Sequence, residues 1–181
     1  MRVREAAPDD APALAAIYGH HVLHGVGTFE ETSPSPEEMT RRLEAVRALR
    51  LPYLVAQAEE GVIGFAYASA FRPRAAYRYA AEDSVYVAPG HIGRGVGRAL
   101  VGEVVARCEA MGLRQLVAVI GGSDNTASIG LHRSLGFEMK GVTPGLGFKH
   151  GRWVDVVWMQ KALNAGATAP PSGAGLDLGA S

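Results

Sequence analysis

Cysteine is almost absent from this 181-residue sequence: Cys108 is the only one, so an intramolecular disulfide cannot form. Residues 1–5 contain no apolar signal region, so we expect a cytoplasmic protein. An excess of either charge is also lacking, because 18 lysines and arginines balance 18 aspartates and glutamates. With no net charge, the protein as a whole would not attract nucleic acid or an anionic membrane. We therefore expect a small molecule or a local peptide as the substrate.

The sequence favours neither a metal site nor a cysteine nucleophile. His20 and His24 are four residues apart and could share a metal ion, but no third ligand is evident, so we expect no metal site. Cys108 could act as a nucleophile. However, it falls on the apolar stripe of a predicted helix that begins near Val96, so we predict a buried, structural thiol.

The composition is that of an ordinary globular protein, with 48% hydrophobic and 20% charged residues. This length is sufficient for one domain with its own core. Residues 164–181 differ, because they are mostly alanine, glycine, proline and serine with almost no apolar bulk. We therefore expect a single domain over residues 1–163 and a disordered C-terminal tail over residues 164–181.

Hydrophobic periodicity and turn signals outline the secondary structure. Alternating or continuous apolar runs predict strands over residues 3–6, 53–58, 62–70, 82–88, 113–120, 137–142 and 153–161. Helical spacing and capping residues predict helices that begin near Pro8, Ser35, Val96 and Ser123 or Asp124. Residues 143–152 are predicted to form a glycine-rich loop. This order of elements favours an α/β fold with mixed, largely antiparallel strand pairing.

The chain is organised around residues 84–100, where a strand breaks into a glycine-rich turn and continues as a helix. Three glycines and two arginines come together there: Gly93, Arg94, Gly95, Gly97 and Arg98. Glycines let the backbone approach a ligand closely, and the free N–H groups of a helix start favour a phosphate or pyrophosphate. The spacing matches neither the Walker pattern nor the dinucleotide pattern G-x-G-x-x-G.

A third pattern does fit. Residues 92–97 resemble the acetyl-CoA loop of the GNAT superfamily of N-acetyltransferases, in which backbone amides hold the CoA pyrophosphate. Residues 125–132 resemble the second CoA segment of the same superfamily. Residues 76–77, Glu82 and residues 147–153 are similar to the phosphinothricin and methionine sulfoximine N-acetyltransferases, and this resemblance covers about residues 2–162.

The resemblance implies a GNAT fold, with a mixed central sheet flanked by helices, and acetyl transfer from acetyl-CoA to the α-amine of a small amino acid. The amine would attack directly in a ternary complex, after Glu82 removes a proton from the α-ammonium group. His132 stands where many members carry a tyrosine, and it would protonate the departing thiolate. The alternatives are a solvated carboxylate for Glu82 and a packing role for His132.

The residues that the resemblance assigns to acetyl-CoA follow the strand, the glycine turn and two helices. They are Val85, Tyr86, Val87, Gly93, Arg94, Gly95, Val96, Gly97, Arg98, Asn125 and Ser128. Ile92 stands where the superfamily usually has glutamine or arginine. We therefore expect one side-chain contact to the pyrophosphate to be missing, while the backbone amides suffice.

Residues 71–79 carry three arginines and two tyrosines, with no carboxylate until Glu82. Arginine binds carboxylate or phosphinate groups bidentately, so this stretch predicts a clamp for an acidic substrate group; a solvated surface or a subunit contact is the alternative. Phe29 is either a wall of the acceptor pocket or an ordinary core residue. The substrate-binding residues that we predict are Phe29, Arg72, Arg74, Tyr77 and Ser84.

Three other functions remain open at this point. The acceptor could be a protein N-terminus, a polyamine or an aminoglycoside, although pockets for the last two would be lined with acids rather than arginines. The chain could also be a CoA-binding sensor without catalysis, or a dinucleotide-binding module. For the acetyltransferase we expect a homodimer.

Overall fold

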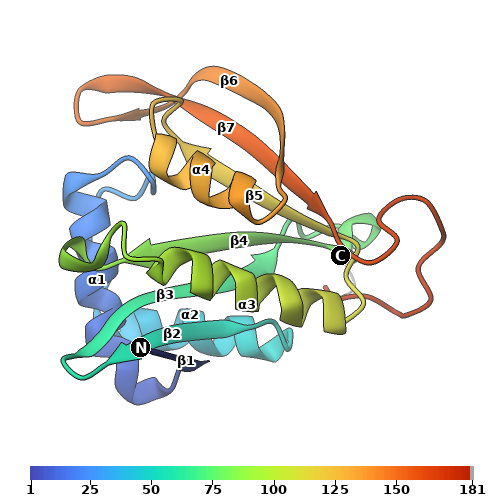
Figure 1. Cartoon of the computed structure of the whole chain (residues 1–181), viewed down its shortest axis with the longest axis horizontal. Helices are drawn as coiled ribbons and strands as arrows, with labels where there is room; N and C mark the ends of the chain where they lie inside the picture. The colour runs from blue at the N-terminus through green and yellow to red at the C-terminus, as the bar shows by residue number, and fades with distance from the viewer. Residues whose placement is uncertain (180–181) are drawn as a thin grey trace.

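The computed structural model describes residues 1–179 and is built on one seven-stranded sheet (Figure 1). The strands lie in the order β1-β2-β3-β4-β5-β7-β6. Their bounds are β1 (Arg2–Glu5), β2 (Tyr53–Ala58), β3 (Gly61–Ala70), β4 (Ala80–Val87), β5 (Gln115–Gly121), β6 (Glu138–Lys149) and β7 (Arg152–Ala162). β4 and β5 are parallel and the other neighbours are antiparallel. The predicted mixed α/β sheet is therefore confirmed.

Helices cover both faces of this sheet. They are α1 (Ala11–His24), α2 (Pro36–Ala48), α3 (Val96–Ala110) and α4 (Thr126–Ser134). In Figure 1, α1 and α2 lie behind the sheet and α3 lies in front of it. Short 3-10 turns, η1 (Pro8–Asp10), η2 (Ala75–Tyr77) and η3 (Pro89–His91), come before α1, β4 and α3. Within residues 1–179, no helix has the length and apolar character needed to span a membrane.

The side chains of β4 alternate between the two helical layers, as the two-residue period of a strand predicts. Tyr86 points toward α1, where its ring meets that of Tyr18 edge-on at 4.7 Å between centroids. Val85 and Val87 point toward the opposite face and lie next to Gly97 of α3. β4 thus presents one set of side chains to each layer.

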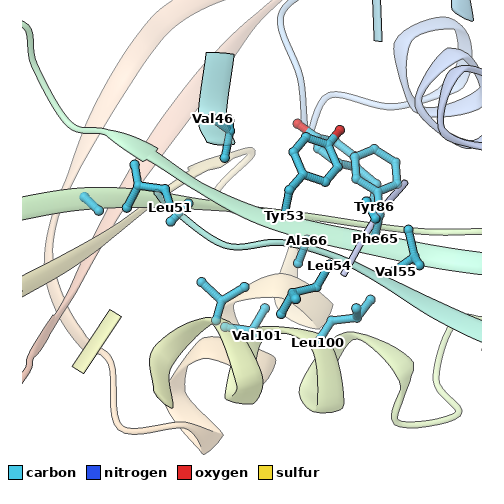
Figure 2. Close-up of a cluster of buried hydrophobic side chains, with 14 of the residues drawn as sticks. Val46, Leu51, Tyr53, Leu54, Val55, Phe65, Ala66, Tyr86, Leu100 and Val101 are labelled. Carbon is cyan, nitrogen blue, oxygen red and sulfur yellow. The ribbon is translucent and has the colours of Figure 1, made fainter. Parts of the chain in front are cut away.

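Both layers are filled by buried apolar side chains (Figure 2). On one face of the sheet the labelled aromatic residues are Tyr53, Phe65 and Tyr86, and α3 contributes Leu100 and Val101 on the other. Cys108 belongs to this core and is 0% exposed. Burial raises the pKa of its thiol to about 12, so the nucleophilic thiolate is scarce near neutral pH. The predicted structural cysteine is confirmed.

The largest difference from the predicted element boundaries lies between β6 and β7. The predicted loop over residues 143–152 is largely strand, because β6 and β7 pair up to Lys149 and Arg152 and leave a two-residue turn. β6 is an edge strand, and its register shifts between Met139 and Gly141 and again between Thr143 and Gly147. An edge strand with bulges accommodates proline and glycine that a central strand would reject.

Helix α4 also begins slightly later than predicted. The cap is Asn125 rather than Ser123 or Asp124, because Asn125 Oδ1 accepts a hydrogen bond from the N–H of Ser128 at 3.2 Å. The cap of α2 is confirmed, since Ser35 Oγ accepts from the N–H of Glu38 at 3.3 Å.

The C-terminal residues 164–179 lie against the domain, which differs from the expectation of a disordered tail; residues 180–181 of that tail lie outside the described residues. Backbone carbonyls supply most of the contacts, because Arg114 donates to the carbonyl oxygens of Gly166 and Ala169. Leu176 adds one apolar anchor and is only 5% exposed. Polar backbone contacts of this kind leave no signature in composition.

Candidate active site

The candidate site is created by the separation of β4 from β5. These parallel strands pair from Ala80 with Gln115 to Asp83 with Ala118, and both strands then continue without pairing to each other. A cleft of about 550 Å³ opens between them and extends to α3 and α4. Its walls include these predicted site residues: Ser84, Val85, Tyr86, Val87, Gly93, Gly95, Gly97, Arg98, Asn125, Ser128 and His132.

The remaining predicted residues do not line this cleft. Val96 is 3% exposed and packs in the core, and Arg94 is exposed on the turn before α3. Arg72, Arg74 and Tyr77 lie in the loop that leads into β4, and Glu82 lies at the start of that strand. Phe29 lies apart from them, in the α1–α2 loop beside Gly121 at the end of β5.

The turn before α3 has a backbone suited to a close ligand. Gly93 and Gly95 have φ of 78° and 81°, which side chains disfavour, and no atom lies within 4 Å of where their Cβ atoms would stand. The first N–H groups of α3 have no helical partner and lie at the positive end of the helix dipole. A pyrophosphate fits this open, positively polarised surface, and Arg98 adds charge at the cleft wall.

Gly97 has a packing role that the sequence did not predict. A Cβ at this position would stand 2.7 Å from Cδ1 of Leu131 in α4. The missing side chain therefore leaves room for Leu131 of α4 to pack against the start of α3.

His132 and Asp83 form a buried pair across the cleft wall. Nε2 of His132 lies 2.9 Å from Oδ2 of Asp83, and Nδ1 lies 2.8 Å from the carbonyl oxygen of Ser128. Burial lowers the pKa of His132, but the hydrogen bond and charge of Asp83, with the Ser128 carbonyl, outweigh it and raise the pKa above its usual value. A carbonyl oxygen only accepts, so Nδ1 carries a proton, and in the charged form the ring donates at both nitrogens.

Asp83 is a site residue that sequence reasoning missed. Its side chain is fully buried, and its Oδ1 atom has no hydrogen-bond partner within the described structure. The available signal was an acidic residue in the middle of an otherwise apolar strand face, next to Glu82 in sequence. A buried carboxylate is normally paired, so this position implied a cationic partner on the helix opposite.

Glu82 precedes Asp83 and therefore points to the other face of β4. Its side chain is 28% exposed, and its Oε2 atom lies 4.0 Å from Nη1 of Arg72. Burial raises the pKa of Glu82, Arg72 opposes this effect, and Asp83 adds to it, so the pKa lies above the usual value for glutamate. Such a carboxylate holds a proton more readily than an exposed one, which suits a general base.

The arginine loop, residues 71–79, stands next to Glu82. The guanidinium group of Arg72 lies over the ring of Phe71, 4.4 Å from its centroid. Tyr77 is 42% exposed and meets Phe71 edge-on. Arg74 is exposed and caps η2. The loop thus places the guanidinium group of Arg72 close to the carboxylate of Glu82.

The α1–α2 loop closes the site from the other side. Phe29 is 42% exposed, so it is not a core residue. Its ring covers Gly147 of β6, where a Cβ would stand 2.3 Å from Cε2, and lies beside Gly121 at the end of β5. Lys149 is only 1% exposed and donates from Nζ to the carbonyl oxygen of Thr28 at 2.8 Å. β6 and the α1–α2 loop are therefore fastened together.

His21 is a second residue of the cleft wall that sequence reasoning missed. Its Nε2 atom lies 2.9 Å from the carbonyl oxygen of Val87 at the end of β4. Burial lowers the pKa of His21, so the neutral ring donates this hydrogen bond near pH 7. In the sequence, His21 falls on the apolar face of the predicted helix, so its position indicated only a packing role.

The sheet splits between two parallel strands, and a helix start suited to an anion lies at the split. The chain belongs to the acetyltransferase (GNAT) family, whose model matches residues 22–137. The predicted GNAT fold is confirmed.

Several proteins of known name within this family are similar to the chain. The chain is 52% identical to phosphinothricin N-acetyltransferase of Alcaligenes faecalis over 169 residues, which is 93% of this chain and 86% of that protein. It is 37% identical to L-methionine sulfoximine/L-methionine sulfone acetyltransferase of Salmonella typhimurium, over 91% of this chain and 95% of that protein. The crystal structure of a phosphinothricin acetyltransferase from Sinorhizobium meliloti in complex with acetyl-CoA superposes with a TM-score of 0.91 at 48% identity, over 94% and 92% of the chains.

Proposed function

We propose that this chain transfers an acetyl group from acetyl-CoA to the α-amine of a small amino acid such as phosphinothricin or methionine sulfoximine. One observation carries the proposal: a cleft suited to an anion lies along the split between β4 and β5, while Glu82 and Arg72 stand together at the start of β4, outside the walls of this cleft. The proposed nucleotide site and the proposed acceptor residues thus occupy different parts of β4. Family membership and the names of the relatives support the same reaction.

Acetyl-CoA is the co-substrate that supplies the activated acetyl group. The backbone at Gly93 and Gly95, with Arg98, would hold its pyrophosphate. Beyond Asp83 the edge of β4 is free of β5, so the backbone N–H groups on that edge are available to the cleft. They would orient the bound chain and polarise the thioester carbonyl, because preorganised donors stabilise the charge that develops there.

Glu82 would act as the general base. An α-ammonium group cannot attack a thioester until it loses a proton, and Glu82 would take that proton directly or through one water molecule. His132 lines the cleft on the other face and would protonate the departing thiolate. Since its two nitrogens contact Asp83 and Ser128, it can do so only by releasing one of these hydrogen bonds.

Arg72 and Arg74 would bind the carboxylate or phosphinate of the acceptor. Arg72 already stands 4.0 Å from Glu82, so an amino acid can place its ammonium group at Glu82 and its anionic group at the loop. Tyr77 stands in the same loop, and we propose that Ser84, in the cleft wall, and Phe29, beside Gly121, contact the acceptor from the side of the cleft. This arrangement favours a free amino acid over a polyamine, which would require acidic walls.

We also propose a homodimer in the cytoplasm. Large apolar side chains are exposed on the β6–β7 edge, with Leu146, Phe148 and Trp153 at 55%, 58% and 68%. An exposed apolar edge of this kind is typical of a subunit contact. The single buried thiol of Cys108 suits a reducing compartment. Light scattering on the purified protein would test the dimer.

A thiol-release assay over a panel of amino acids and amines tests the reaction. We expect release of CoA with phosphinothricin and methionine sulfoximine and little release with polyamines. Binding of acetyl-CoA without thiol release for any amine would instead support a CoA-binding sensor.

A further inference from the structure

The C-terminal strap, residues 164–179, crosses the ends of β4 and β5 next to the arginine loop (Figure 1). Arg114, at the entrance to β5, anchors its first half. Its Nε and Nη2 atoms donate to the carbonyl oxygens of Gly166 and Ala169 at 2.9 and 2.6 Å. The N–H of Arg114 in turn donates to the carbonyl oxygen of Tyr79 at 2.9 Å. Arg114 therefore contacts both the strap and the arginine loop.

The second half of the strap contacts the arginine loop itself. The N–H of Leu176 donates to the carbonyl oxygen of Arg78 at 2.8 Å, and the hydroxyl of Tyr79 donates to the carbonyl oxygen of Gly173 at 2.7 Å. Gly175 has φ of 75°, and a Cβ there would stand 2.7 Å from the Arg78 carbonyl oxygen. The side chain of Leu176 is only 5% exposed, so its burial adds to the hydrogen bonds between the strap and the arginine loop.

Apart from the strap, the start of β5 also holds one end of the loop, because the N–H groups of Arg114 and Gln115 donate to the carbonyl oxygen of Tyr79 at 2.9 and 3.2 Å. Residues 72–78 are exposed, and the hydrogen bonds described between Arg74 and Tyr77 and between Ala75 and Arg78 lie within the loop. At the other end, the N–H of Phe71 donates to the carbonyl oxygen of Ala80 at 3.4 Å. The strap therefore supplies long-range support at the end of the loop opposite to Phe71.

We propose that the C-terminal strap is a positioning element for acceptor binding: it orders the arginine loop so that Arg72 and Arg74 face the acceptor next to Glu82. The inference rests on the proposed function of that loop. The strap touches neither substrate in this scheme. It reduces the conformational freedom that the loop would otherwise lose when the acceptor binds, so it lowers the acceptor KM.

Two kinds of variant test the proposal. The first ends the chain at Asn164, which keeps the buried Leu163. The second is Gly175→Ala, whose Cβ pushes against the Arg78 backbone; Gly173→Ala is its matched control, because no atom lies within 4 Å of a Cβ there and its carbonyl is retained. We expect the truncated chain and Gly175→Ala to raise the KM for phosphinothricin by about five-fold or more. The acetyl-CoA KM and kcat should stay within about two-fold, and Gly173→Ala should behave as the unmodified chain.

Hydrogen exchange supplies a readout that does not depend on acetyl transfer. Amides of residues 71–80 should exchange faster in the truncated chain and in Gly175→Ala, and those of α3 should not. A fall in melting temperature with an unchanged acceptor KM and unchanged exchange in the loop would overturn the proposal and leave the strap a stabilising element only. If the full chain acetylates no amino acid, the proposed function fails, and loop exchange alone then decides whether the strap orders the loop.

Discussion

Oδ2 of Asp83 lies 2.9 Å from Nε2 of His132, and both side chains are buried. Glu82, the residue before Asp83, points to the opposite face of the same strand and stands 4.0 Å from Arg72. The group that we propose as base and the group that we propose as acid are therefore separated by the thickness of one strand. This separation prevents Glu82 and His132 from forming an ion pair with each other, which would remove the proton acceptor.

The first prediction concerns Glu82→Gln. We expect kcat to fall by about 100-fold or more near neutral pH, because the proton acceptor is lost. Acetyl-CoA affinity should be unchanged, since Glu82 does not line the cleft. Thiol release and titration calorimetry measure the two effects. Turnover like that of the unmodified enzyme would refute the assignment of Glu82 as base.

The second prediction concerns the buried pair. His132 has a raised pKa in the folded state, so its stabilisation is complete below the unfolded value of about 6.5 and is lost as pH rises through the folded pKa. Asp83→Asn should therefore lower the free energy of unfolding by about 3 kcal/mol at pH 6 and by less at pH 9. Urea denaturation at both pH values measures this difference.

A matched control for the buried pair is the exposed pair between Lys140 and Glu138. Glu138→Gln should change stability little at either pH, because solvent screens the interaction. An equal loss for Asp83→Asn at pH 6 and pH 9 would show that a charged His132 does not contribute to folding.

The third prediction distinguishes Gly95, in the turn before α3, from Gly97, at the start of α3. Gly95→Val should weaken acetyl-CoA binding by about ten-fold or more, because the side chain occupies the open surface and strains a backbone with φ of 81°. Gly97→Ala should instead lower the melting temperature, because its Cβ meets Leu131. Adding Leu131→Ala should recover part of that loss. Unchanged acetyl-CoA binding by Gly95→Val in calorimetry would count against the pyrophosphate site.

The fourth prediction concerns acceptor choice. Arg74→Ala should raise the acceptor KM by about ten-fold or more and leave the acetyl-CoA KM nearly unchanged, because a guanidinium–carboxylate contact is lost on one side only. Phosphinothricin and methionine sulfoximine should be better substrates than their amides. If the amides react as fast as the free acids, the arginine clamp is wrong, and a peptide or simple amine becomes the favoured acceptor.

The family and the glycine turn could be predicted from sequence because their signals are local. Strand and helix periods depend on neighbouring residues, and the spacing of Gly93 and Gly95 reflects a backbone conformation that few other residues adopt. The alternation along β4 likewise follows from geometry within one strand, which is why Glu82 and Tyr86 could be assigned to one face before the fold was known.

Tertiary structure alone decided the features that join distant segments. The pairing of Asp83 with His132 links positions 49 residues apart. The packing role of Gly97 depends on Leu131 in another helix, and the docking of residues 164–179 depends on Arg114 and Tyr79. Composition describes how much apolar surface a segment can bury, but backbone carbonyls accept hydrogen bonds whatever their side chains are. The sequence by itself therefore determined the fold and the glycine turn, while long-range contacts decided how Asp83, Gly97 and the C-terminal strap are held.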